Sequence, residues 1–414
     1  MSKAVYTLLL YLLLPHALLH LLWRGRRQRG YLRHVSERFG RFTAKIGQPV
    51  IWVHAVSVGE TRAAEPLIAA LRARHPRHRI LLTHATPTGR ATGESLFGNE
   101  VSRCYLPYDF SWAVRRFLRH FKPQAGIMME TEIWPNLIDG CVRSGVPCYL
   151  VNARMSEKSA RGYRRFGALT RRALRALSGI GAQTARDAER LGSLGARNVV
   201  VTGNIKFDRA IPPDMRALGA DMRALFGRER AVLLAASTRE GEEALILDAL
   251  DRIEAPGLLT VIVPRHPQRF DEVAALLGQR GIRYARRSAN QAVAADTTVV
   301  LGDSMGEMFA YYAASDLAFV GGSLLPLGGQ NLLEACAVGR PVVVGPHTFN
   351  FEQATEGAIQ AGAALRVADG KQLAETVTAL LKDPARREAM AVAGRRFSEA
   401  HRGATARTME MLKW

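Results

Sequence analysis

The sequence is poor in the residues that build disulfide frameworks and metal sites. It contains four cysteines, and no two of them form a C-x-x-C pair: Cys104, Cys141, Cys148 and Cys336. None of the 11 histidines is combined with a C-x-x-C pair in the pattern of a zinc finger. We therefore predict neither a disulfide framework nor a metal site, and a reducing, cytosolic environment is favoured.

The usual phosphate-binding loops are also missing. The segment VIWVHAVSVGE (50–60) has the pattern of a buried strand, a turn and a helix start, where many α/β proteins hold a phosphate. Its turn has one glycine, Gly59, and an acid, Glu60, follows directly. Phosphate loops carry several glycines and often a lysine. The segment is therefore not predicted to bind phosphate, and Glu60 needs another role.

The net charge of +20 is carried by one half of the chain. Residues 1–210 contain 34 Lys and Arg against 13 Asp and Glu, whereas residues 211–414 contain 23 against 24. A one-sided basic charge indicates an anionic partner for the first half, such as a membrane surface, a phosphorylated ligand or nucleic acid. A general arginine bias, with 49 Arg against 8 Lys, does not explain why the second half is neutral.

The N-terminus contains the one long apolar run. Residues 4–23 carry no formal charge, and 20 helical residues are about what is needed to cross roughly 30 Å of hydrocarbon. Arginines follow at once in residues 24–41, which predicts that the chain after the run lies on the cytoplasmic side. Because Pro15, His16 and His20 interrupt the run, a helix lying in the membrane interface is the alternative to a spanning helix.

Beyond residue 48, short β-branched runs alternate with longer amphipathic ones, which is typical of parallel strands with crossover helices. The strands expected in the first half are 50–56, 79–85, 125–130, 147–153, 179–184 and 198–203, and those of the second half are 231–237, 258–264, 297–303, 317–323 and 340–346. The pattern predicts an α/β protein with two doubly wound, Rossmann-like domains.

A proline pair within residues 208–228 interrupts the pattern, which indicates a linker there. The predicted division has four parts: an anchor and basic segment (1–47), a first Rossmann-like domain (48–210), a linker (211–228) and a second Rossmann-like domain with C-terminal helices (229–414). In such domains ligands bind beyond the carboxyl ends of the strands. The residues that follow each strand are therefore the candidate site residues.

In the second half, these positions combine cations, glycine turns and helix starts. They are Arg265–His266–Pro267, Ser304–Met305–Gly306–Glu307, Gly321–Gly322–Ser323 and Gly328–Gly329–Gln330–Asn331, followed by Glu334. Backbone N–H groups and an arginine suit a phosphate or carboxylate, and a glutamate can accept hydrogen bonds from sugar hydroxyls. The set fits a sugar nucleotide. Taken singly, a glycine pair can simply form a turn, and Glu334 can simply complement its helix start.

In the first half, the same positions carry carboxylates, amides and cations: Glu60, 86–90, 130–136, 152–154 and 204–206. This edge is suited to a polar acceptor. A carboxylate there can act as the general base toward an attacking hydroxyl, and a nearby helix N-terminus would keep it ionised. The alternative is that Glu60 only stabilises its helix start, by about 0.3–1 kcal/mol.

Several motifs together resemble the 3-deoxy-D-manno-octulosonic acid (Kdo) transferases of lipopolysaccharide biosynthesis, glycosyltransferase family 30. They are HAVSVGE (54–60), TPTGR (86–90), ETEIWPNL (130–137), NARMSEKS (152–159), GNIKFD (203–208), STREGEE (237–243), VPRHPQRF (263–270), GDSMGEM (302–308) and residues 319–351. The resemblance covers nearly the whole chain. Gln330 and Arg239 stand where the family often has histidine.

This resemblance implies a GT-B glycosyltransferase, in which two Rossmann-like domains face each other across a cleft after an N-terminal membrane anchor. The donor would be CMP-Kdo, bound by the second domain. The acceptor would be lipid IVA, the phosphorylated and acylated lipid A precursor, bound by the first. Anionic lipids of the bacterial inner membrane would be further partners on its cytoplasmic face, in agreement with the basic first half. No metal or other cofactor is expected.

The family motifs also imply residue roles. Glu60 corresponds to the base of an inverting attack, and Glu130 and Lys206 correspond to residues that support the transition state. The residues at the CMP-binding positions are Pro264, Arg265, His266, Met305, Gly306, Glu307, Asn331, Leu332, Leu333 and Glu334.

Two alternatives remain at this stage. One is another sugar-nucleotide enzyme of the same architecture, a different glycosyltransferase or an epimerase. The other is a membrane-tethered nucleic-acid-binding protein, motivated by the basic first half. The sequence has no basic stripe interleaved with aromatic residues of the kind that stacks bases, so no nucleic-acid partner is predicted.

Overall fold

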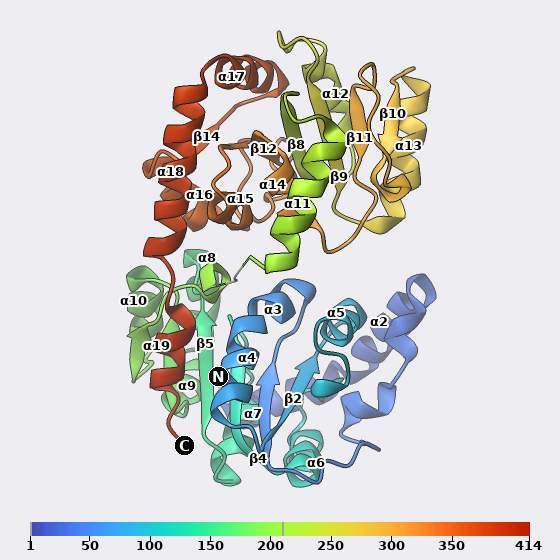
Figure 1. Ribbon diagram of the computed structural model, residues 1–414. Helices are drawn as coiled ribbons and strands as arrows, with labels where there is room; N and C mark the ends of the chain where they lie inside the picture. Colours follow the sequence, from blue (N-terminus) through green and yellow to red (C-terminus); the bar gives the residue numbers. More distant parts are fainter. Residues whose placement is uncertain (1, 209–210) are drawn as a thin grey trace. The chain divides into compact units, whose positions relative to one another are not determined.

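Each half of the chain forms a parallel sheet of seven strands (Figure 1). The computed structural model describes residues 2–208 and 211–414, and these divide into two compact units. The first unit holds residues up to 208 together with 401–414, and the second holds 211–400. Each unit therefore has its own sheet, which confirms the prediction of two Rossmann-like domains.

The first sheet has the order β3-β2-β1-β4-β5-β6-β7. Its strands are β1 (Val50–His54), β2 (Arg79–His84), β3 (Ser102–Tyr105), β4 (Pro123–Met129), β5 (Cys148–Ala153), β6 (Gly179–Ala182) and β7 (Val199–Val201). The helices of this unit are α1 (Lys3–Leu12), α2 (Leu14–Arg27), α3 (Val58–Ala63), α4 (Glu65–Arg74), α5 (Pro87–Phe97), α6 (Ser111–Phe121), α7 (Pro135–Arg143), α8 (Glu157–Arg165), α9 (Gly167–Arg175), α10 (Ala185–Ser193) and α19 (Ala404–Met411).

The second sheet has the order β10-β11-β9-β8-β12-β13-β14. Its strands are β8 (Val232–Thr238), β9 (Leu259–Pro264), β10 (Tyr284–Arg286), β11 (Val299–Leu301), β12 (Leu317–Val320), β13 (Val342–Val344) and β14 (Ala364–Arg366). The helices are α11 (Pro213–Phe226), α12 (Glu242–Leu250), α13 (Phe270–Gln279), α14 (Met308–Ala314), α15 (Leu333–Val338), α16 (Glu352–Gln360), α17 (Gly370–Lys382) and α18 (Pro384–Ala400).

The central strands are buried on both faces, which is why they read as continuous apolar runs rather than alternating ones. All five residues of β1 are buried. Helices begin directly beyond several strands because a Ser or Thr caps them: the side chains of Ser57, Thr86 and Thr184 accept hydrogen bonds from the first turns of α3, α5 and α10. Helix N-termini are thereby set at the carboxyl edge of the first sheet.

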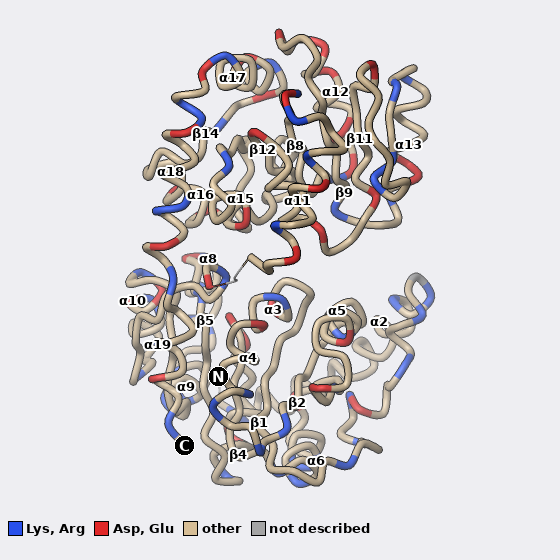
Figure 2. Tube along the Cα trace, viewed as in Figure 1, with Lys and Arg blue, Asp and Glu red and all other residues tan. Residues whose placement is uncertain are grey.

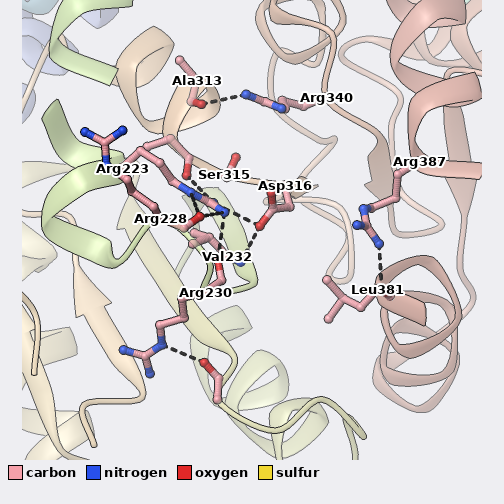
Figure 3. Close-up of polar contacts among 12 residues, drawn as sticks. Arg223, Arg228, Arg230, Val232, Ala313, Ser315, Asp316, Arg340, Leu381 and Arg387 are labelled. Atoms are coloured by element: carbon pink, nitrogen blue, oxygen red, sulfur yellow. Dashed lines mark hydrogen bonds and ion pairs between the residues drawn. The ribbon is translucent and has the colours of Figure 1, made fainter. Parts of the chain in front are cut away.

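The expected linker is a helix. α11 packs against α14, and Arg223 on α11 holds the start of the second sheet. Its Nη1 donates to the carbonyl oxygen of Ala314 at 3.1 Å and to Asp316 Oδ2 at 3.0 Å, and the same Asp316 oxygen accepts the Val232 N–H at 2.8 Å (Figure 3). The prediction of a linker over 211–228 was therefore wrong for most of its length, and residues 209 and 210, at its expected start, lie outside the described residues.

The C-terminal helix belongs to the first unit, which corrects the expectation that residues 229–414 form one domain. α19 packs against α4 (Figure 1). Ala404 and Met409 of α19, with Leu412 just beyond it, belong to the hydrophobic core of the first sheet. Asp208 accepts the Gly403 N–H at 2.7 Å. Burial of this apolar side explains why the segment leaves the second unit after α18.

The N-terminal run is not one helix, because α1 and α2 are bent by 49° at a break beside Pro15. The expectation of a single continuous anchor helix was therefore wrong. Among the described residues, no single helix has the length and apolar composition needed to cross a membrane, whereas the bent pair together meets both criteria. Lys and Arg gather at the end of α2 (Figure 2).

We expect Gly219→Ala to destabilise the second unit. A Cβ at Gly219 would lie 2.5 Å from the Ala313 Cβ and 3.1 Å from the Ala310 carbonyl oxygen, so α11 and α14 would have to separate. Overpacking of this kind costs about 1–3 kcal/mol. The matched control is Gly278→Ala on α13, where a Cβ meets nothing within 4 Å and should stabilise by about 0.4–1 kcal/mol. Thermal unfolding of both variants checks this, and equal melting temperatures would contradict the packing argument.

Candidate active site

The candidate catalytic residues lie at the switch point of the first sheet. The strand order reverses between β1 and β4, which are neighbours although they are not consecutive in the chain. Ligands of open α/β sheets bind beyond the carboxyl ends of the strands at such a point. Glu60 follows β1 and Glu130 follows β4 directly, so the topology brings these two predicted residues to one place.

Glu60 takes part in a capping box at the start of α3. The Ser57 hydroxyl donates to Glu60 Oε1 at 3.0 Å and accepts the Glu60 N–H at 3.5 Å, and the Val56 N–H donates to Oε2 at 2.9 Å. The helix-start role of Glu60 is therefore real. It does not exclude chemistry, because the carboxylate remains partly exposed.

The expectation that the helix start keeps Glu60 ionised was incomplete. Burial raises the pKa of Glu60 to about 7, and repulsion from Glu130 and Glu132 adds to this rise, while the hydrogen bonds from Val56 and Ser57 oppose it. Desolvation therefore outweighs the N–H donors. A carboxyl that titrates near neutral pH is suited to accept a proton from a hydroxyl and to release it afterwards.

Glu130 and Lys206 form an ion pair beside Glu60. Lys206, in the short 3-10 helix Ile205–Asp208, donates from Nζ to Glu130 Oε1 at 2.9 Å, and about a quarter of each side chain is exposed. Glu130 has φ 58°, a left-handed conformation that is uncommon outside glycine and occurs at functional sites. The structure thus brings Glu60, Glu130 and Lys206 together.

Glu132 is a further member of this cluster that the sequence analysis did not single out. Its Oε2 accepts the Trp134 indole N–H at 2.5 Å and lies 3.9 Å from Nε2 of His54. Burial raises the pKa of Glu132, as does repulsion from Glu130. Burial also lowers the pKa of His54 to about 4, so that this ring is neutral at pH 7. The sequence feature that could have identified Glu132 is its place as the second acid of the ETEIWPN motif, two residues after Glu130.

In the second unit, the first glycine turn after β12 is already occupied. Glu242 at the start of α12 accepts the N–H groups of Gly322, Ser323 and Leu324 at 2.6, 3.0 and 3.0 Å, and that of Arg239 at 3.2 Å. The expectation that the Gly321–Ser323 turn offers its N–H groups to a ligand anion was therefore wrong, because a buried carboxylate of the protein accepts them.

Arg265 and His266 follow β9, as predicted, and several arginine side chains lie near His266. The Arg265 N–H donates to the Thr238 carbonyl oxygen at 2.9 Å, which ties this turn to the end of β8. The pKa of His266 is lowered by partial burial and by repulsion from Arg239, Arg265 and Arg269. This convergence of cations suits an anionic ligand group. Pro264 is the last, buried residue of β9.

Met305, Gly306 and Glu307 follow β11 as predicted. The Met305 side chain is 50% exposed and Gly306 has φ 86°, so both lie on an open turn. Glu307 is bound to the protein itself: its Oε2 accepts the Ser304 hydroxyl at 2.5 Å and lies 3.2 Å from the Arg287 Nε. Glu307 therefore holds the Met305–Gly306 turn in place, and the residues of this turn are the ones that a ligand could reach.

The Asn331–Glu334 segment makes its own local bonds. Asn331 Oδ1 accepts the Leu333 N–H at 3.1 Å, and Asn331 Nδ2 donates to Glu334 Oε1 at 3.4 Å. Leu332 and Leu333 have exposed fractions of 0% and 3%, so their side chains are core residues and a ligand could meet only their backbone. The accessible members of this segment are Asn331 and Glu334.

Within residues 2–208 and 211–414, no three His, Cys, Asp or Glu side chains are grouped so that they could hold a metal ion. All four cysteines are free and buried. Metal independence stays a prediction.

Comparison with known proteins agrees with this geometry. Residues 33–209 match the family model "3-Deoxy-D-manno-octulosonic-acid transferase (kdotransferase)", and residues 246–397 match "Glycosyl transferases group 1". The chain is similar to the UDP-GlcNAc 2-epimerase of Neisseria meningitidis in fold, with a TM-score of 0.60 at 16% identity over 87% of this chain and 99% of that one. The two Rossmann-like units thus have the architecture of the GT-B class.

Sequence similarity narrows the class to a family. The 3-deoxy-D-manno-octulosonic acid transferase of Bordetella pertussis is 47% identical over 100% of this chain and 99% of its own length. The enzyme of the same name from Haemophilus influenzae (strain ATCC 51907 / DSM 11121 / KW20 / Rd) is 37% identical over 100% and 98%. The chain belongs to the 3-deoxy-D-manno-octulosonic acid transferase family.

We expect Glu242→Ala to loosen the glycine turn after β12. The change leaves buried N–H groups without an acceptor, at about 1–3 kcal/mol for each such donor. Hydrogen exchange at Gly322, Ser323 and Leu324 should accelerate, and the melting temperature should fall. Glu240→Ala, at a neighbouring exposed acid, is the control and should stay within about 0.5 kcal/mol of the unchanged protein. Unaltered exchange in Glu242→Ala would refute the assigned role.

Proposed function

We propose that the protein transfers Kdo from CMP-Kdo to lipid IVA with inversion at the anomeric carbon, and that Glu60 is the general base. The observation that carries this proposal is the placement of Glu60, with its pKa raised to about 7, beside the Glu130–Lys206 pair at the switch point of the first sheet. Membership of the family supports the transferred sugar.

In the proposed reaction, the acceptor hydroxyl oxygen attacks the anomeric carbon of Kdo. A bond forms between these two atoms, and the bond from the anomeric carbon to the CMP phosphate oxygen breaks, so that CMP leaves with the bonding electron pair. Glu60 takes the hydroxyl proton as the new bond forms. At pH 7 a carboxyl with a pKa of about 7 is ionised in a substantial fraction of molecules, which is the form the step requires.

Lys206 and Glu130 have supporting roles in the proposal. Lys206 is a cation at this edge and can stabilise negative charge that develops as the donor bond breaks. Glu130 holds the ammonium group at 2.9 Å and keeps it oriented. Glu130 has a left-handed backbone, with φ 58°, directly after the last residue of β4.

The second unit is proposed to bind the CMP part of the donor. The arginines around His266 would meet the phosphate, and the turn at Met305–Gly306 and the accessible Asn331 and Glu334 would meet the nucleoside. No metal is required in this scheme, because cationic side chains stabilise the anionic leaving group.

We further propose that the protein works on the cytoplasmic face of the bacterial inner membrane, next to anionic lipids. The basic surplus of the first half and the apolar N-terminal helices support this location. The acyl chains of lipid IVA would stay in the bilayer while its phosphorylated sugars meet the first unit.

The first test is a mass measurement of the lipid product. The full chain in membranes is incubated with CMP-Kdo and lipid IVA, and the lipid is weighed by mass spectrometry. We expect the lipid to gain Kdo, and Glu60→Gln to reduce the rate by at least about a hundredfold because the general base is lost. Glu94→Gln, at an exposed acid of α5, is the matched control and should retain activity.

If the folded wild-type protein does not increase the mass of the lipid when CMP-Kdo is supplied, CMP-Kdo is not the donor. UDP-sugars would then be the next donors to test, since the fold is shared with a UDP-GlcNAc epimerase. An active Glu60→Gln variant would leave Glu60 with its helix-start role alone.

The pH dependence of kcat/KM is a separate prediction. The base must be ionised, so the rate should fall about tenfold per pH unit below pH 7 and level off above it, because burial raises the pKa of Glu60 to about 7. Steady-state kinetics between pH 5 and 9 would measure this decrease of kcat/KM on the acidic side of the pH profile. A rate that stays nearly constant from pH 9 down to about pH 5.5, as an ordinary carboxyl pKa of about 4.3 would give, would contradict the desolvation of Glu60.

A further inference from the structure

Helices α1 and α2 together carry a largely exposed set of apolar side chains. Ten large hydrophobic side chains between residues 5 and 23 are exposed: Val5, Leu8, Leu9, Tyr11, Leu12, Leu13, Leu18, Leu19, Leu22 and Trp23. The exposed fractions of Leu12 and Leu19 reach 68% and 66%. An exposed apolar surface of this extent, continued by arginines, is typical of a surface that contacts lipid.

The opposite side of α1 is docked on the first unit. The Tyr6 hydroxyl donates to Asp109 Oδ2 at 2.9 Å, and the Thr7 hydroxyl donates to Asn136 Oδ1 at 3.3 Å. Lys3 forms an ion pair with Asp139, whose side chain is 14% exposed. These contacts come from the first two turns of the helix, and the Tyr11 ring in its last turn contacts the Phe110 ring at a centroid distance of 5.2 Å, so α1 as a whole lies against the folded unit.

A docked α1 cannot at the same time cross a bilayer. The helix has ten residues, about 15 Å in length, which is half of the roughly 30 Å of hydrocarbon. The Lys3 contact keeps its first turn beside the Asp139 carboxylate on the folded unit. The exposed Arg24, Arg26 and Arg29 at the other end of the pair suit anionic headgroups. This geometry favours the interfacial alternative over the spanning one.

Asp109 joins α1 to the start of α7. The carboxylate is 3% exposed, its Oδ2 accepts the Asn136 N–H at 2.9 Å as well as the Tyr6 hydroxyl, and its Oδ1 accepts the Leu137 N–H at 2.7 Å. Asp109 thus satisfies two backbone donors of the first turn of α7. Residues 130–134, which carry Glu130 and Glu132, run directly into this turn.

We propose that the hydrogen bond between Tyr6 and Asp109, here called the latch, docks α1 on the first unit as an interfacial helix that faces lipid. The latch also fixes the start of α7. The membrane-contacting helix thereby helps to position the loop that carries Glu130 and Glu132. The partner is an anionic bilayer surface. Tyr6 and Asp109 are positioning residues, since they act through α7. The effect on turnover rests on the proposed function, whereas the docking does not.

The docking is tested by cross-linking in a bilayer. The full-length Lys3→Cys/Asp139→Cys variant is bound to vesicles of phosphatidylcholine and phosphatidylglycerol and treated with a short bismaleimide. The four natural cysteines are buried. We expect an intramolecular cross-link between the two new thiols while the protein is on the vesicle. A spanning helix would carry residue 3 to the far side, so a vesicle-bound variant without the cross-link would overturn the proposal.

The positioning role is tested with Tyr6→Phe, which removes one hydroxyl. The matched control is Tyr11→Phe on the same helix, whose ring contacts Phe110 with a centroid distance of 5.2 Å. We expect hydrogen exchange at the Asn136 and Leu137 amides of vesicle-bound Tyr6→Phe to accelerate by about fivefold, the factor that corresponds to one lost hydrogen bond of about 1 kcal/mol. The control should leave both rates unchanged.

The steady-state kinetics of Kdo transfer provide a second measurement on the same variants. Tyr6→Phe should lower kcat with the KM for CMP-Kdo unchanged, because the donor residues lie in the other unit. Exchange rates equal to those of Tyr11→Phe would overturn the latch. Since cross-linking and exchange need no turnover, a protein that transfers no Kdo but shows both effects would refute the proposed function and leave the latch standing.

Discussion

Everything in the candidate site depends on one constraint, that the carboxyl ends of parallel strands meet at a single edge. In the first sheet, β1 and β4 are adjacent while their crossovers depart in opposite directions, so helices leave an open place beyond their ends. Glu60 and Glu130 occupy that place although 70 positions separate them in the sequence. Lys206 reaches it from a short helix after β7. The chemistry is assembled by topology, not by sequence proximity.

Two glutamates at helix starts, Glu242 and Glu60, show how the surroundings decide the role of an acid. Glu242 is surrounded by four backbone N–H donors and serves to hold a turn. Glu60 has two hydrogen-bond donors and two acidic neighbours, and its pKa rises to about 7. Burial raises the pKa of both carboxyls, but Glu242 is bound by four backbone donors, whereas Glu60 has two acidic neighbours that raise its pKa further. The same residue type at the start of a helix therefore holds a turn in the second unit and combines a capping role with a titratable carboxyl in the first.

The sequence predicted the strands that are buried on both faces, such as β1 and β9, because these read as continuous apolar runs. It missed β3, β10 and β14, which are edge strands of four, three and three residues without such a run. Glu60, Glu130 and Lys206 could be found because each follows a strand and matches a family motif. The Glu242 role could not, since its partners lie about 80 positions later and only the folded sheet brings them together.

The return of α19 to the first unit has a consequence for how the chain is made. A ribosome releases residues 211–400 before residues 401–414, so the second unit is complete while the first still lacks the helix that covers α4. The core beneath Met409 and Leu412 therefore closes only after residues 211–400 have been made. The first unit, which carries Glu60 and α1, is thus the later of the two units to acquire its final stability.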